Sequence, residues 1–162
     1  MDLKFKTMKK LFITAAIAAM FSVNAFADGG KKAKAEGEKN VSYSALNKFA
    51  VDYDNASNVV WTVTPNCQKV DFVLEGAKYT AFYDLDGEYL GRTQEVALSA
   101  LPESSRKEVT AKYADYTVSH VIKYETNTVE PLVYFVDLLK GDKEIVLKAT
   151  PNQNLAFFQA IK

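Results

Sequence analysis

The strongest constraint on the fold is a pattern that occurs twice: one amphipathic helical stretch followed by about four short stretches of strand character. Phe49 and Tyr53 are four residues apart, as on one face of a helix. Val109 and Tyr113 repeat this spacing about 60 residues later. Two copies of the unit predict an α+β fold, a tandem repeat of one helix plus four antiparallel strands. Together they give one sheet of about eight strands with the helices on one face.

Both predicted helices carry recognisable start signals. Ser42 or Ser44 can cap the first helix. Pro102 fits the first position of the second helix, where a missing N–H is tolerated. The apolar stripe of the first helix is expected to comprise Leu46, Phe49, Ala50 and Tyr53.

The N-terminal region divides into two segments before the repeats begin. Residues 1–27 resemble a signal peptide in composition, with lysines before an apolar stretch and small residues before the expected cut. Residues 28–40 are rich in glycine, lysine and glutamate, which predicts a disordered tether. One domain is expected over 41–162, with repeat one over about 41–98 and repeat two over about 99–162.

Cleavage near Ala27 predicts a periplasmic or secreted protein. The apolar stretch is shorter than the ~20 residues that a membrane-spanning helix needs, so no stable membrane insertion is expected after signal removal. The full chain has a formal net charge of +0, and loss of the lysine-rich signal leaves it slightly acidic. This balance argues against a nucleic-acid partner. Cys67 is the single cysteine, which excludes an internal disulfide, and its place in a turn predicts an exposed thiol.

The acidic stretch 84–88, Asp-Leu-Asp-Gly-Glu, could suggest a metal loop or a catalytic carboxylate pair. An EF-hand loop with Gly87 at its sixth position would place Phe82 and Thr93 at positions that require carboxylates. A solvated hairpin tip also lacks the apolar pocket that raises a carboxyl pKa. Leu-Asp-Gly is instead typical of a three-residue hairpin with a left-handed glycine, so the sequence predicts a turn at Gly87 and no metal site.

A second hairpin is predicted at Glu75-Gly76-Ala77-Lys78, with Gly76 first in a two-residue turn. In that register Leu74 faces Tyr79. The alternation then gathers one apolar face, formed by Val70, Phe72, Leu74, Tyr79, Ala81 and Tyr83.

Nothing in the sequence indicates catalysis or a cofactor. The single histidine, His120, lies in a predicted strand, and no G-x-S-x-G elbow accompanies it. The chain has too few cysteines and histidines for a zinc site, and it has no G-x-G-x-x-G loop. The sequence therefore predicts a surface or structural role for His120. It does not predict that the chain is an enzyme.

One predicted strand is apolar on both of its faces. Leu132, Tyr134 and Val136 alternate with Val133 and Phe135. A sheet covered by helices on one side normally shows water a polar second face. Apolar residues on both faces therefore indicate a second covering layer, an oligomer or a binding surface.

The order of motifs resembles a known family of exported proteins. Its strongest elements here are Trp61, the hairpin at 83–87, and Leu101-Pro102 at a helix start. With the aromatic strand "YTAFYDLDGEYL", they are similar to the periplasmic PepSY-like, beta-lactamase-inhibitor-protein-like family. The resemblance covers about residues 45–162 and implies tandem helix-plus-sheet repeats with a non-enzymatic role. Repeat two lacks the tryptophan and has His120 nearby instead.

Three functions remain open at this level. The first is an exported binding or inhibitor-like protein that engages a periplasmic protein or peptide through the helix-free face of the sheet. The candidate contact residues are Asp71, Val73, Phe82, Val133, Phe135 and Asp137. The second is a small-ligand sensor or carrier with a cavity between helices and sheet. The third is a self-associating envelope component.

Overall fold

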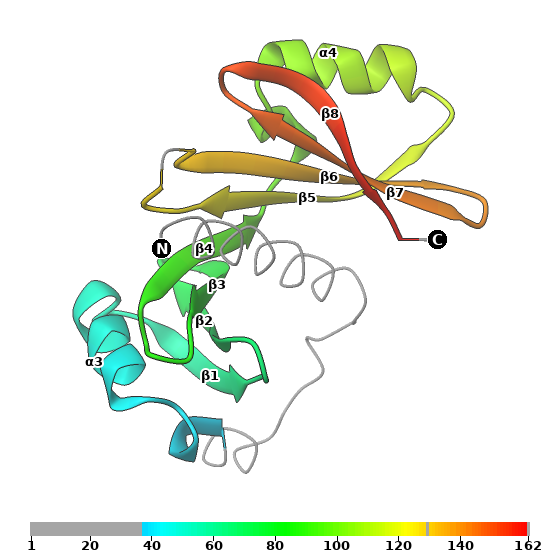
Figure 1. Cartoon of the computed structure of the whole chain (residues 1–162). Helices are drawn as coiled ribbons and strands as arrows, with labels where there is room; N and C mark the ends of the chain where they lie inside the picture. The colour runs from blue at the N-terminus through cyan, green and yellow to red at the C-terminus, as the bar shows by residue number, and fades with distance from the viewer. Residues whose placement is uncertain (1–36, 129, 162) are drawn as a thin grey trace, which may run out of the picture.

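The computed structural model describes residues 37–128 and 130–161, which form one antiparallel sheet with helices packed on one face (Figure 1). The sheet has eight strands that pair in chain order, from β1 to β8. This arrangement confirms the predicted fold. The strands are β1 (Ser57–Val63), β2 (Gln68–Leu74), β3 (Ala77–Tyr83), β4 (Tyr89–Glu95), β5 (Thr117–Glu125), β6 (Leu132–Lys140), β7 (Lys143–Thr150) and β8 (Gln153–Ala160).

The expected signal peptide and residues 28–36 of the expected tether lie outside the described residues. Residues 37–39 are helical, so the folded part of the chain begins earlier than the predicted boundary at residue 41. Gly37 lies so close to the sheet that a Cβ there would be 2.2 Å from the carbonyl oxygen of Trp61. This close approach corrects the C-terminal end of the expected tether.

Helix α3 (Tyr43–Asp52) packs on the sheet of repeat one. Its N-cap is Ser42, whose Oγ accepts a hydrogen bond from the Ala45 N–H at 3.3 Å. Phe49 meets Trp61 and Phe72 at ring-centroid distances of 5.5 and 5.1 Å. The buried stripe runs through Ala45, Phe49 and Tyr53.

The predicted stripe of α3 was wrong at one position, because Ala50 is exposed. The helix meets the sheet along every fourth residue, so Ala45 takes the place expected for Ala50. Leu46 lies half-buried beside the same core.

The β2–β3 hairpin differs from its predicted register. Its two turn residues are Glu75 and Gly76, with φ of 51° and 80°. Two positive φ values are the requirement of a type I′ turn. Leu74 therefore pairs with Ala77, and Phe72 pairs with Tyr79. The register moves by two residues, and an even shift leaves every side chain on its predicted face.

Helix α4 (Glu103–Lys112) covers the sheet of repeat two, after a short 3-10 turn, η1 (Leu98–Ala100) (Figure 1). Pro102 is the N-cap, one residue before its predicted position. Val109 is buried and Tyr113 half-buried against this core, which agrees with the predicted spacing. The buried core of repeat two comprises Leu101, Val109, Val121, Tyr134, Val136, Leu138, Leu147 and Ala149.

The two helices lie on the same face of the sheet. A row of directly paired residues across the junction of the repeats shows this. Ala81 pairs with Arg92, and Arg92 with Glu125, which in turn pairs with Leu132. Ala81 belongs to the core under α3, and Leu132 packs against the core under α4. Directly opposed residues in a sheet share a face. The opposite side of the sheet is called the helix-free face below.

The predicted exposure of Cys67 was wrong. Its side chain is 9% exposed, and its Sγ lies 3.5 Å from Thr64 Oγ1. Thr64 Oγ1 also accepts from the Cys67 N–H at 3.0 Å, which folds the turn over the sulfur.

Among the described residues, no helix combines the length and the apolar character needed to cross a membrane.

Candidate binding face of the sheet

The structure places all six sequence-predicted contact residues on the helix-free face, in two groups. Asp71 and Val73 of β2 lie with Phe82 of β3 in repeat one. Val133, Phe135 and Asp137 all lie on β6 in repeat two. Strands β4 and β5 separate the two groups, so the structure does not bring the six residues into one cluster.

The repeat-one group is held by its own neighbours. Thr80 Oγ1 donates to Asp71 Oδ1 at 2.6 Å, and Lys69 Nζ lies 3.7 Å from the other carboxylate oxygen. Phe82 is 5% exposed and faces Gly91 across the strand pair. Asp71 is therefore already satisfied by hydrogen bonding and by charge.

Val133 and Phe135 of the repeat-two group belong to an apolar cluster on this face, which we call the helix-free cluster. Its buried members are Ile122, Tyr124, Val133, Phe135 and Val146. Phe158 of β8 packs edge-on against Phe135, with ring centroids 4.9 Å apart. Phe135 is 1% exposed and Val133 is 5% exposed. The apolar residues on the two faces of β6 therefore belong to two different clusters. One is the core under α4, and the other is the helix-free cluster.

A polar row crosses the sheet beside the helix-free cluster. His120 of β5 pairs with Asp137 of β6, Asp137 pairs with Val146 of β7, and Val146 pairs with Gln159 of β8. Asp137 is 2% exposed. Two buried atoms of this row lack hydrogen-bond partners, Asp137 Oδ1 and Gln159 Nε2. One is an acceptor and the other a donor.

The environment of Asp137 disfavours its charged form. Burial raises the pKa of Asp137, and the nearby Glu144 carboxylate raises it further. A hydrogen bond from Ser119 and the proximity of His120 oppose these effects without cancelling them. None of the ion pairs among the described residues includes Asp137. The face therefore holds a buried carboxyl group whose surroundings, taken together, favour the neutral form.

The exposed end of the polar row is occupied by His120. Its Nδ1 lies 2.8 Å from Glu95 Oε1, and the two side chains are 47% and 59% exposed. The location agrees with the predicted surface role of this histidine. Sequence reasoning missed Glu95, Glu144 and Gln159 as members of this site. Their alternation was readable, but β5–β6 and β7–β8 each contain bulges that decide which residues face one another.

The acidic hairpin between β3 and β4 has the predicted turn geometry. Gly87 has φ of 86°. Asp84 Oδ1 accepts from the backbone N–H groups of Asp86 and Glu88 at 3.0 and 2.8 Å. Within the described ranges, 37–128 and 130–161, no group of three or more His, Cys, Asp or Glu side chains is arranged to hold a metal ion.

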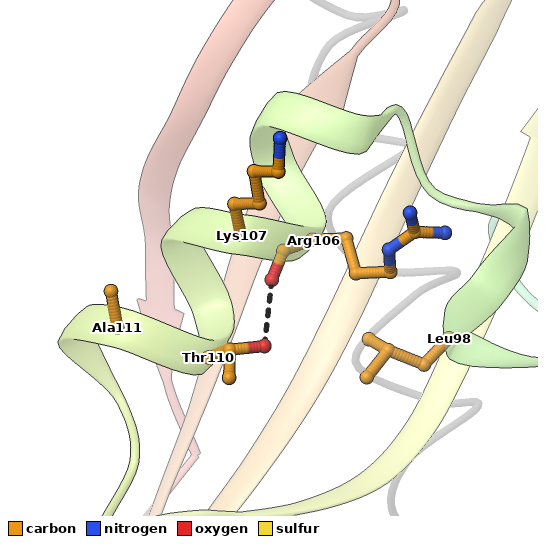
Figure 2. Close-up of a pocket in the computed structure, with 5 residues that line it drawn as sticks. All are labelled: Leu98, Arg106, Lys107, Thr110 and Ala111. Atoms are coloured by element: carbon orange, nitrogen blue, oxygen red, sulfur yellow. Dashed lines mark hydrogen bonds between the residues drawn. The ribbon is translucent and has the colours of Figure 1, made fainter.

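A hollow of about 360 Å³ lies on α4 and its preceding turn (Figure 2). Its lining residues are Leu98, Arg106, Lys107, Thr110 and Ala111. Thr110 Oγ1 donates to the Arg106 carbonyl at 3.0 Å, which satisfies its hydroxyl locally (Figure 2). No sheet residue lines this hollow. It does not correspond to the cavity between helix and sheet that the carrier hypothesis requires.

Comparison with known proteins identifies the architecture. No family model matches the chain. No curated protein matches it either. Solved structures do match. A BLIP-like protein from Bacteroides fragilis superposes with a TM-score of 0.65 at 17% identity, over 74% of this chain and 86% of that one. The chain has a BLIP-like fold.

Two further structures agree with this fold. A candidate periplasmic protein from Bacteroides eggerthii matches with a TM-score of 0.67 at 16% identity, over 74% of this chain and 88% of that one. A DUF2874 family protein from Bacteroides uniformis matches with a TM-score of 0.65 at 14% identity, over the same shares. These structures support the BLIP-like part of the sequence resemblance, and they do not support PepSY specifically.

Proposed function

We propose that this chain is an exported, periplasmic protein without enzymatic activity that binds a protein or peptide through the helix-free face of its sheet. The observation that carries the proposal is the helix-free cluster, an apolar set on the sheet face that neither α3 nor α4 covers. Its buried members pack against half-buried Phe158 and Ile161, and an apolar sheet face without a helix over it commonly serves as an interaction surface. The BLIP-like fold and a periplasmic description among similar structures support the same reading.

The six predicted contact residues take different parts in this proposal. Val73 and Asp71 are half-buried and can touch a partner directly. Phe82, Val133 and Phe135 are buried and shape the face beneath. Asp137 is the buried polar residue among the contact residues of repeat two. The exposed pair of His120 and Glu95 forms a rim there.

Site-specific photo-crosslinking in the cells that produce the chain tests the proposal. A photoreactive phenylalanine analogue replaces His120 on the helix-free face or Lys107 on exposed α4. Capture of the same partner from position 120 and not from position 107 is expected. Capture from position 107 alone, or no adduct at either position, contradicts binding through the helix-free face.

A further inference from the structure

The buried carboxyl of Asp137 requires an explanation that the fold alone does not give. A carboxyl group taken from water into an apolar environment is unfavourable unless it gains hydrogen bonds or a counter-ion. Ser119 donates a hydrogen bond to this carboxyl group, but the Oδ1 atom has no hydrogen-bond partner. The helix-free cluster borders Asp137 on one side, with Val146 directly across the strand pair. A position optimised for stability would hold a valine or leucine here.

The carboxylate nearest to Asp137 adds to the negative potential there. Glu144 raises the pKa of Asp137 rather than compensating its charge. His120 is held by Glu95, with Nδ1 and Oε1 2.8 Å apart. Lys148, on the same face of β7, lies 2.7 Å from Glu130. Lys148 is therefore paired elsewhere, and His120, which is shared with Glu95, does not cancel the rise of the Asp137 pKa.

A second unpartnered group points to the chemistry of an occupant. Gln159 Nε2 is buried without an acceptor, two strands from Asp137 in the same row. Neighbouring strands are about 4.8 Å apart, so the two groups are separated by about 10 Å across the sheet. A ligand that satisfies both must present a donor to Asp137 and an acceptor to Gln159. A peptide segment with a cationic side chain and a backbone carbonyl has both groups.

The polar row also reaches solvent next to Asp137. His120 adjoins Asp137 and is 47% exposed, so the polar row reaches water one strand away from the carboxyl. Lysine and arginine carry their charge on a long apolar stem that packs well along apolar surface. The helix-free cluster provides that surface.

We propose that Asp137 is the recognition site for a lysine or arginine side chain in an otherwise apolar segment of the partner protein. This inference rests on the proposed function and specifies the partner chemistry at that face. The cation pairs with Asp137, Gln159 donates to a carbonyl of the segment, and the apolar neighbours pack on the helix-free cluster.

Selection from a random dodecapeptide library on the immobilised mature chain tests the inference. Asp137→Asn serves as the matched target, because it keeps the shape of the side chain and removes its charge. Apolar peptides with one lysine or arginine are expected from the wild type, with enrichment of basic residues at least about tenfold above that on Asp137→Asn. Equal basic enrichment on both targets, or none on the wild type, overturns the proposal.

The selected peptide then gives a direct measure of the charge pairing. Replacing its basic residue by norleucine keeps an apolar stem and removes the charge. Binding to the wild type is expected to weaken at least about tenfold, and binding to Asp137→Asn less than about twofold. Urea unfolding checks the fold of the variant, and a higher midpoint than wild type is expected because a buried charge is removed. Gln159→Leu, a second and uncharged variant, is expected to weaken both peptides equally.

Two outcomes separate this inference from the proposed function. Apolar peptides without a cation that crosslink from position 120 would overturn the lysine or arginine inference and leave binding through the face intact. Selected peptides that crosslink only from position 107 would overturn both. A wild-type dimer in ultracentrifugation that Asp137→Asn abolishes would identify a second copy of the chain as the occupant, and would also overturn the inference.

Discussion

Gln68 and Ser42 are joined by two hydrogen bonds, although they are 26 residues apart. The Ser42 N–H donates to Gln68 Oε1 at 2.6 Å, and Gln68 Nε2 donates to Ser42 Oγ at 3.0 Å. Gln68 Nε2 also donates to the Asp84 carbonyl at 2.6 Å. One buried amide therefore connects the start of α3 to the β3–β4 hairpin.

Gln68→Leu is expected to destabilise the protein by about 2–4 kcal/mol, because it leaves the Ser42 N–H and the Asp84 carbonyl without their partner. Urea unfolding measures the change. Gln153→Leu, at an exposed glutamine of β8, is the control and should change stability by less than about 0.5 kcal/mol. Equal effects of the two substitutions would contradict the role of Gln68.

Gly87 and Gly76 provide a matched pair for separating backbone strain from crowding. Both have positive φ, 86° and 80°. A Cβ at Gly87 would lie 2.7 Å from the Ala45 nitrogen, whereas a Cβ at Gly76 meets nothing within 4 Å. Gly76→Ala should cost about 1 kcal/mol and Gly87→Ala more than about 3 kcal/mol. Thermal unfolding of both variants decides this, and similar midpoints would show that the hairpin tip does not press on α3.

The two aspartates of the acidic hairpin, Asp84 and Asp86, should contribute differently to the stability of the protein. Asp84 accepts two backbone hydrogen bonds, whereas Asp86 is exposed. Asp84→Ala is expected to cost about 1–2 kcal/mol, and Asp86→Asn less than about 0.5 kcal/mol. Urea titrations with and without calcium measure both. A calcium-dependent rise of the wild-type midpoint that Asp86→Asn removes would instead indicate a metal loop.

Asp137 should make stability depend on pH in a direction opposite to that of most carboxylates. Its pKa is raised in the folded protein by burial. The folded state therefore binds a proton more tightly than the unfolded state, and stability falls as pH rises through the raised pKa. At neutral pH Asp137→Asn should be more stable than wild type by about 1 kcal/mol. The difference should shrink as pH falls towards the unfolded pKa of about 4. A difference that is constant across this range would contradict the assignment.

Arg92 should contribute stability across the junction of the repeats. Its Nε lies 2.8 Å from Glu125 Oε2, and its guanidinium carbon is 5.0 Å from the Tyr79 ring centroid. Lysine cannot reproduce the flat stacking or the directional hydrogen bond. Arg92→Lys is expected to cost about 1–2 kcal/mol in calorimetry, against less than about 0.5 kcal/mol for the control Arg106→Lys on α4.

The fold was predictable because local patterns determine most of it. Alternation placed Phe72 and Tyr79 on one face, and this survived an incorrect register because the actual turn shifts the pairing by an even number. Glu75 in a left-handed conformation was the missing detail, since a glutamate gives no local signal for positive φ. The burial of Cys67 was missed for a similar reason, because it follows from Thr64 folding over the turn.

The candidate site was predictable only in part. Alternation was enough to put Asp137 and Phe135 on the helix-free face. The burial of Phe135 depends on Phe158, which belongs to a strand more than 20 residues later in the sequence. The alignment of Asp137 with Gln159 depends on where the β7–β8 bulge falls, and no residue type marks that position reliably.

The chain-order pairing of the strands has a consequence for how the molecule is made. Each strand from β2 onward pairs with the strand before it, so its first pairing partner has already been synthesised. Repeat one holds its own helix, hairpins and core, and it can assemble while repeat two is still emerging. The edge of β4 then serves as a template on which β5 to β8 are added one by one.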